Sequence, residues 1–140
     1  MSYNAMDIAK YIINKCTTDQ NPISNLQLQK ILYYVQKTFL ENGIVAFDDE
    51  IEAWQFGPVV PDVYYHYCGF GSMHIRMRYD TNICLEYRTI INPIVDNKRL
   101  LNPWNMVEDT HKQGKAWDYI YNNGLGNHHI IPKNIIKMKG

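Results

Sequence analysis

Four carboxylates lie within five positions of one short stretch, and two large aromatic side chains follow them. The stretch reads FDDEIEAWQFGPVVPDVY, from Phe47 to Tyr64. Clustered carboxylates serve general acid–base catalysis or bind a divalent cation, whereas exposed aromatic rings are typical of a surface that binds another protein. Three classes of site therefore have to be compared for the acids Asp48, Asp49, Glu50 and Glu52.

The acidic cluster lacks the spacing of a calcium loop, which spreads its oxygen ligands over about twelve residues around a central glycine. Glu50 and Glu52 would share one face of a strand, so a carboxylate pair is geometrically allowed. No second set of acids completes such a site, and an exposed acidic rim is favoured. The chain has no Gly-rich phosphate loop, Walker motif or G-x-S-x-G elbow. We therefore expect neither an enzyme nor a bound cofactor.

The histidines and cysteines do not indicate a metal site either. Structural zinc sites begin with a close cysteine pair, and that spacing is missing among His66, Cys68, His74 and Cys84. We assign His128 and His129 to a loop at the surface. His111 could be catalytic, but a lone histidine more often forms local hydrogen bonds that fix a turn, and this structural role is favoured.

Helical patterns must position most of these side chains. Apolar residues recur at helical spacing over residues 4–16, with Asn4 as the cap and Asp7 in the first turn. The next helix begins with a capping box, Ser24 with Gln27, and is expected to end near Gly43 and to pack antiparallel to the first. Further helices are predicted over residues 61–68, 84–98 (where Pro93 kinks the helix or starts its second half), 103–110, 116–122 and 132–139.

Residues 50–56 change to an alternating period and predict a short strand. Residues 73–79 alternate weakly, so they predict a strand that could form a hairpin with residues 50–56. The expected fold is mainly α with a small β element (α+β), a compact helical globule in a single domain over residues 1–140.

The overall charge requires no particular partner, since Lys plus Arg and Asp plus Glu are 14 each. Residues 1–70 carry 4 basic and 8 acidic side chains (−4), and residues 71–140 carry 10 and 6 (+4). This asymmetry would favour oriented docking to a charged partner, unless the charges are solvated on unrelated faces. Three unclustered cysteines suit a reducing compartment. Without a signal-peptide core or a run of about 18 apolar residues, we expect a cytoplasmic protein with no membrane partner.

Three stretches of the chain resemble the Panacea domain, the SocA-like antitoxin family that also includes phage-associated proteins. These are MDIAKYIIN, PISNLQLQKILYYVQ and FDDEIEAWQFGPVVPDVYYHY, in the same order and spacing. The combination of L-Q-K-x-L-Y with W-x-x-G-P-V-x-P is specific, and VEDTH followed by AW resembles the family's L-x-x-x-T-H … P-W ending. Ala116 and Met106 depart from the proline and leucine of that ending, and residues 72–101 match nothing in it.

The resemblance implies an antitoxin that binds a cognate toxin and carries no catalytic residues. We place the toxin-facing patch on Asp48, Asp49, Glu50, Glu52, Trp54, Phe56, Pro58 and Tyr64, with Gln29, Lys30 and Tyr33 beneath or beside it. Aromatic anchors would supply the binding energy and the acids would orient a basic toxin. Whether Trp54 lies at the surface or in the core stays open at this point.

An alternative interpretation is a nucleic-acid-binding regulator that recognises operator DNA. The second half of the chain supplies cations that could contact phosphate: Arg76, Arg78, Arg88, Lys98, Arg99, Lys133, Lys137 and Lys139. The dispersal of these bases and the near-neutral overall charge argue against it.

Overall fold

A central helix, six further helices and a small sheet make up the computed structural model, which describes residues 3–140. The helices are α1 (Ala5–Thr18), α2 (Asn25–Glu41), α3 (Pro61–Tyr67), α4 (Leu85–Lys98), α5 (Pro103–Thr110), α6 (Ala116–Tyr121) and α7 (Lys133–Lys139). Two short 3-10 turns are η1 (Cys68–Phe70) and η2 (Asn122–Gly124), and the strands are β1 (Ile51–Trp54), β2 (Gly57–Val59) and β3 (His129–Ile131). The expected mainly helical fold with a small β element is confirmed.

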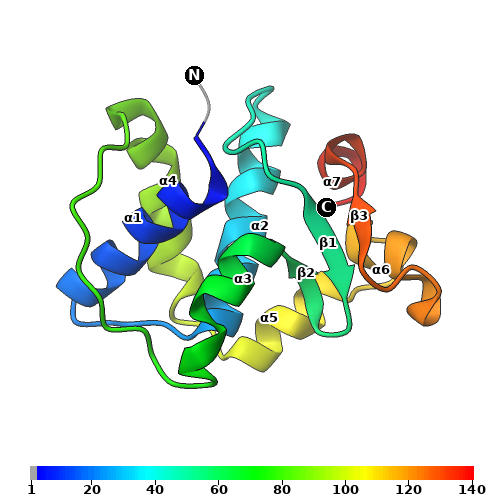
Figure 1. The fold of residues 1–140 in the computed structure, drawn as a ribbon. Coiled ribbons are helices and arrows are strands. Elements are labelled where there is room, and N and C mark those ends of the chain that lie inside the picture. The colour runs from blue at the N-terminus through cyan, green and yellow to red at the C-terminus, as the bar shows by residue number, and fades with distance from the viewer. Residues whose placement is uncertain (1–2) are drawn as a thin grey trace.

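Helix α2 runs through the middle of the molecule, with α1 and α4 on one side and the sheet on the other (Figure 1). Thirteen of its seventeen residues are buried, on all of its faces. It contacts α1, α3, α4, α5, α7 and β2. A helix this enclosed must satisfy its polar side chains internally. Gln36 does so by accepting a hydrogen bond from Ala46 N at 2.9 Å and donating one to Phe47 O at 2.8 Å, which fixes the start of the acidic stretch.

The predicted helix starts agree with the structure. Asn4 and Ser24 each form a complete capping box, with Asp7 and Gln27 as the reciprocal partners. Pro93 lies inside α4 without dividing it, so the span from Leu85 to Lys98 is one helix. Of the helices among residues 3–140, none is long and apolar enough to span a membrane.

The predicted strand around residues 50–56 is present, but its predicted pairing with residues 73–79 is wrong. β1 pairs antiparallel with β2 through a two-residue turn, and on its other edge with β3. Residues 73–79 contribute only one isolated bridge, in which Ile75 N donates to Ile23 O at 2.7 Å. The two edges of β1 are occupied by β2, which follows it directly, and by β3 from near the C-terminus, so no edge of β1 is left for residues 73–79.

Candidate functional site: the aromatic surface around the β1–β2 turn

Side chains from two distant helices hold the β1–β2 hairpin by its backbone. From α2, Gln29 accepts a hydrogen bond from Val60 N at 2.9 Å, and its amide nitrogen donates to Asn25 Oδ1 at 3.0 Å. From α6, Trp117 Nε1 donates to Trp54 O at 2.7 Å. These bonds anchor the end of β1 and the residue that directly follows β2, so the side chains around the turn sit on a rigid support.

Beneath the hairpin lies a buried lysine. Lys30 is fully buried, and its Nζ is 3.4 Å from Pro58 O, the acceptor of its hydrogen bond. A side-chain carbon on Gly57 would lie 2.6 Å from that Nζ, and the Gly57 φ of +120° is one that other residues rarely adopt. Burial lowers the pKa of Lys30 to about 7, since desolvation disfavours the charged form.

His111, at the end of α5, packs against the same hairpin. Its ring stacks on Trp117 with centroids 3.6 Å apart, and it forms a hydrogen bond with the backbone of Phe56. Burial, and then the nearby charge of Lys30, lower the pKa of His111. These contacts let His111 help to fix the turn.

Four aromatic rings gather on one side of the hairpin. The half-buried Trp54 ring lies edge-on to Tyr64 at 5.0 Å, is tilted against Tyr65 at 5.8 Å, and stacks parallel on His128 at 4.3 Å. Its Nε1 donates to Glu52 at 2.9 Å. Trp54 is thus neither a core nor a fully exposed residue, because one side of its ring packs on the protein.

A second aromatic pair is more exposed. Phe56, at the tip of the turn, is 50% exposed, and Trp104 on α5 is 57% exposed. Their rings meet edge to face with centroids 5.7 Å apart. Adjacent large aromatic rings open to solvent are typical of anchors in protein–protein interfaces.

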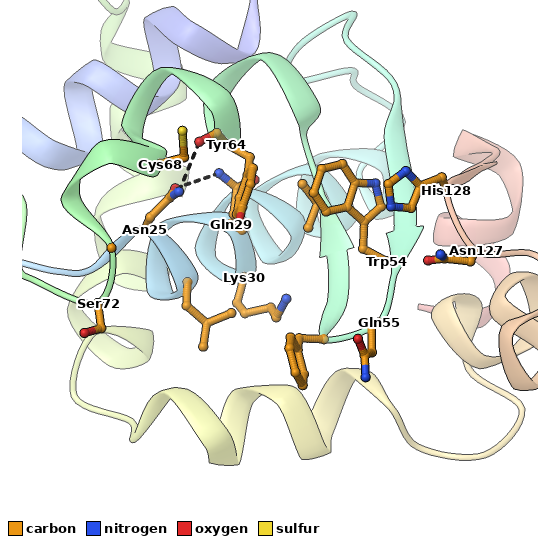
Figure 2. Close-up of a pocket in the computed structure, with 14 residues that line it drawn as sticks. Asn25, Gln29, Lys30, Trp54, Gln55, Tyr64, Cys68, Ser72, Asn127 and His128 are labelled. Atoms are coloured by element: carbon orange, nitrogen blue, oxygen red, sulfur yellow. Dashed lines mark hydrogen bonds between the residues drawn. The ribbon is translucent and has the colours of Figure 1, made fainter.

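A pocket of about 440 Å³ opens between α2, the hairpin, α3 and the segment before β3 (Figure 2). Its lining includes Trp54, Phe56 and Tyr64 on the walls and Lys30 on α2. Figure 2 shows Lys30 extending from α2 toward the strands and His128 lying against Trp54. No acidic side chain lines this pocket.

The acidic cluster lies elsewhere and is partly engaged within the protein. Asp49 accepts a hydrogen bond from Ala5 N at 2.8 Å and so helps to cap α1. Lys133 lies 3.5 Å from a Glu50 carboxylate oxygen and donates to the Asp48 backbone carbonyl at 3.1 Å. A separate pocket of about 290 Å³ is lined by the acids Asp49, Glu50, Glu52 and Asp62. Among residues 3–140, no three His, Cys, Asp or Glu side chains are grouped to hold a metal ion.

The structure brings some of the predicted patch together and separates the rest. One pocket collects Gln29, Lys30, Trp54, Phe56 and Tyr64. Two residues were placed incorrectly in an exposed patch or beside it: Pro58 is buried in β2, and Tyr33 is buried and lines a different pocket with Lys37 and Lys98. Tyr33 instead lies near Thr110 of α5 and the C-terminal residue Gly140.

Two residues of this surface were missed by the sequence analysis. His128 is an exposed turn residue, as its assignment to a surface loop predicted. What the sequence did not show is that its backbone N–H donates to Ala53 O at 2.7 Å and that its ring stacks on Trp54. Trp104 was not singled out, although it follows the cap-and-proline start of α5. A large aromatic in the exposed first turn of a helix was the available signal for Trp104, whereas no local pattern marks His128.

Comparison with known proteins identifies the relatives of this chain. Residues 28–118 match the family model described as "Antitoxin SocA-like, Panacea domain". A protein described as "Antitoxin SocA", from Caulobacter vibrioides (strain NA1000 / CB15N), is 32% identical over 135 residues, covering 86% of this chain and 72% of the relative. No solved structure gives a significant match. The matched region contains the hairpin, Lys30 and His111, and it ends before His128.

Proposed function

The chain belongs to the antitoxin SocA-like, Panacea domain family, and on this premise we propose that it neutralises a cognate toxin by direct protein–protein binding. The observation that carries the binding surface is the exposed pair of Phe56 and Trp104 beside the pocket edged by Trp54 and Tyr64. In this proposal the protein inhibits the toxin by binding to it and catalyses no reaction.

The rigidity of the hairpin supports this choice of surface. Because Gln29 and Trp117 already hold its backbone, little conformational freedom remains to be lost when the toxin docks. Aromatic rings lose few rotamers on binding and bury large areas, so a few of them can dominate the binding energy. We therefore assign the central anchors to Phe56, Trp104 and Trp54.

The acids supply orientation. Glu52 lies in β1 of the same hairpin and Glu50 directly precedes that strand, and both line one pocket with Asp62 at the start of α3. Since they are partly or fully exposed, they act mainly on the rate and geometry of encounter with a basic partner. Asp49 does not take part in this orientation, because its carboxylate already accepts a hydrogen bond from Ala5 N at the start of α1.

The nucleic-acid-binding alternative is not favoured. Several of its proposed cations are engaged within the protein: Arg99 pairs with Asp19 at 2.8 Å and with Asp96 at 3.2 Å. Lys98 lies over the Tyr34 ring at 4.1 Å. Operator binding would require these groups to exchange such contacts for phosphate.

The proposal is tested by a growth assay with the product of the adjacent gene, induced alone and then together with this protein. Wild type should relieve the toxicity, and a Phe56→Ala/Trp104→Ala double variant should not. Both side chains are at least half exposed, so the variant is expected to fold, which circular dichroism can verify.

The matched control is Leu85→Ala, which removes a side chain that is 67% exposed at the start of α4. This helix lies on the far side of α2 from the sheet (Figure 1), so the control should protect like wild type. A harmless neighbour protein would refute the antitoxin assignment. Full protection by the folded double variant would refute the surface but leave the antitoxin assignment standing.

A further inference from the structure

The pocket between α2 and the hairpin contains a buried lysine side chain. Lys30 is fully buried, and among residues 3–140 no carboxylate forms an ion pair with it. Its hydrogen bond to Pro58 O is long, at 3.4 Å. A buried unpaired charge costs folding free energy that an apolar side chain of the same volume would not. An unpaired buried lysine is therefore a candidate for a group that binds a ligand.

The surroundings of Lys30 would favour an anion and an apolar group together. The acids of this region face the other pocket, and none lines this one. The apolar part of the pocket wall is formed by Leu26, Val59 and the rings of Trp54 and Tyr64. The volume of about 440 Å³ lies within the range of small-ligand pockets, which are mostly apolar with a few placed polar groups.

The two amides that α2 contributes to the pocket, Asn25 and Gln29, are already occupied. Asn25 donates to Tyr64 O at 3.2 Å and accepts from Gln29, whose own oxygen accepts from Val60 N. Figure 2 shows the hydrogen bonds of Asn25 with Gln29 on α2 and with the backbone carbonyl of Tyr64 on α3. Of the polar side chains that α2 contributes to the pocket, Lys30 is then the one left to recognise a ligand.

We propose that this pocket binds an apolar carboxylate, with an aromatic or branched body packed against the wall formed by Trp54 and Tyr64 and its carboxylate paired with Lys30. A lysine stem has several rotatable bonds, so Nζ can exchange its long contact with Pro58 O for the ligand by side-chain rotation. A free organic acid and the C-terminal residue of a partner chain share this chemistry. The inference goes beyond the antitoxin role and is tested on the isolated protein.

The test is calorimetric titration of the isolated protein with 3-phenylpropionate and with 3-phenylpropionamide, which differ in charge but share a body. Wild type should bind the acid at least about tenfold more tightly than the amide. Lys30→Met should bind both equally, at the level of the amide. Lys37→Met removes the same charge from the same helix outside this pocket, and it should keep the preference.

Equal affinity of wild type for acid and amide, or no binding of either, would overturn the proposal. So would a preference for the acid that survives in Lys30→Met. If that variant does not fold, Tyr64→Ala replaces it. Tyr64 is only partly buried on the pocket wall, and its loss should weaken both probes, whereas unchanged affinity would place them elsewhere and refute the site.

A tripeptide ending in phenylalanine, as free acid and as C-terminal amide, separates the two sources of ligand. Tighter binding of the peptide acid than of 3-phenylpropionate assigns the pocket to the terminus of a partner chain. Tighter binding of 3-phenylpropionate assigns it to a free organic acid. Either result supports the site. The site is refuted if neither the tripeptide acid nor 3-phenylpropionate binds more tightly than its own amide.

Discussion

Lys30 and Gly57 depend on each other although they are 27 positions apart in the sequence. The missing side chain of Gly57 leaves the space that the Lys30 ammonium occupies, and a carbon there would approach Nζ to 2.6 Å. Both residues belong to the motifs by which the chain resembles its family, L-Q-K-x-L-Y and W-x-x-G-P-V-x-P. The two motifs are thus two halves of one packing arrangement.

The lowered pKa of Lys30 makes the stability of the protein depend on pH. Burial brings the folded-state pKa from 10.5 to about 7, so between these values the unfolded chain binds more protons than the folded protein. The free energy of unfolding should therefore rise with pH above 7, by up to about 1.4 kcal/mol per pH unit from this group. Below pH 7 the lysine is charged in both states and contributes no slope.

Denaturant unfolding of wild type, Lys30→Met and Lys37→Met between pH 6 and 9 checks this effect. Lys30→Met should be more stable than wild type at pH 6, by roughly 2–4 kcal/mol, and the gap should narrow as the pH rises. Lys37→Met should follow wild type at every pH, because Lys37 is partly exposed. A gap that is constant with pH would mean that Lys30 stays charged in the folded protein up to pH 9, so that burial does not lower its pKa into this range.

The β1–β2 hairpin is the element that turns these local contacts into a surface. Its two-residue turn sets Phe56 at the tip, while Gln29 and Trp117 hold the backbone on either side. His111 adds a hydrogen bond to the turn from α5. A turn fixed from three helices presents its aromatic side chains in one geometry, which is what a preorganised binding surface requires.

Gly57→Ala should disturb this element far more than Gly43→Ala. Both glycines have positive φ, +120° and +77°, but only Gly57 has an atom of another residue within 4 Å of a new side-chain carbon. We expect Gly43→Ala to cost about 1 kcal/mol of unfolding free energy and Gly57→Ala at least about 1 kcal/mol more, since the ammonium must move. Thermal denaturation of the two variants measures the difference, and equal losses would show that the contact with Lys30 is readily relieved.

The molecule as a whole is organised around α2. It contacts five other helices and β2, whereas the sheet is completed by β3 at the edge (Figure 1). The proposed binding surface lies where α2, the hairpin, α3 and α5 meet. The most buried helix therefore supports the most exposed aromatic side chains, so the surface rests on the stable part of the fold.

Native-state hydrogen exchange should reflect this organisation. The amides of Ile31, Leu32 and Val35 lie in the fully buried middle of α2 and should exchange only through global unfolding. Those of His129 and Ile130, which are exposed residues of the edge strand β3, should exchange orders of magnitude faster through local opening. Equal protection of β3 and α2 would mean that the whole fold opens as one unit.

The local features of the fold followed from the sequence because each is set by residues a few positions apart. The boxes at Asn4 and Ser24 join a cap to its third helical residue, and Pro61 and Pro103 start helices through their own fixed φ. The motif resemblance likewise identified the family, which the comparisons bear out.

Only the tertiary structure decided which segments meet. The strands are three or four residues long, too short for an alternating pattern to specify a partner, so residues 73–79 were paired with β1 in error and β3 was missed. The stacking of His128 on Trp54 and the approach of Lys30 to Gly57 join residues 74 and 27 positions apart. Whether a side chain such as Trp54 is core or surface depends on what the folded chain brings against it, and no local spacing records that.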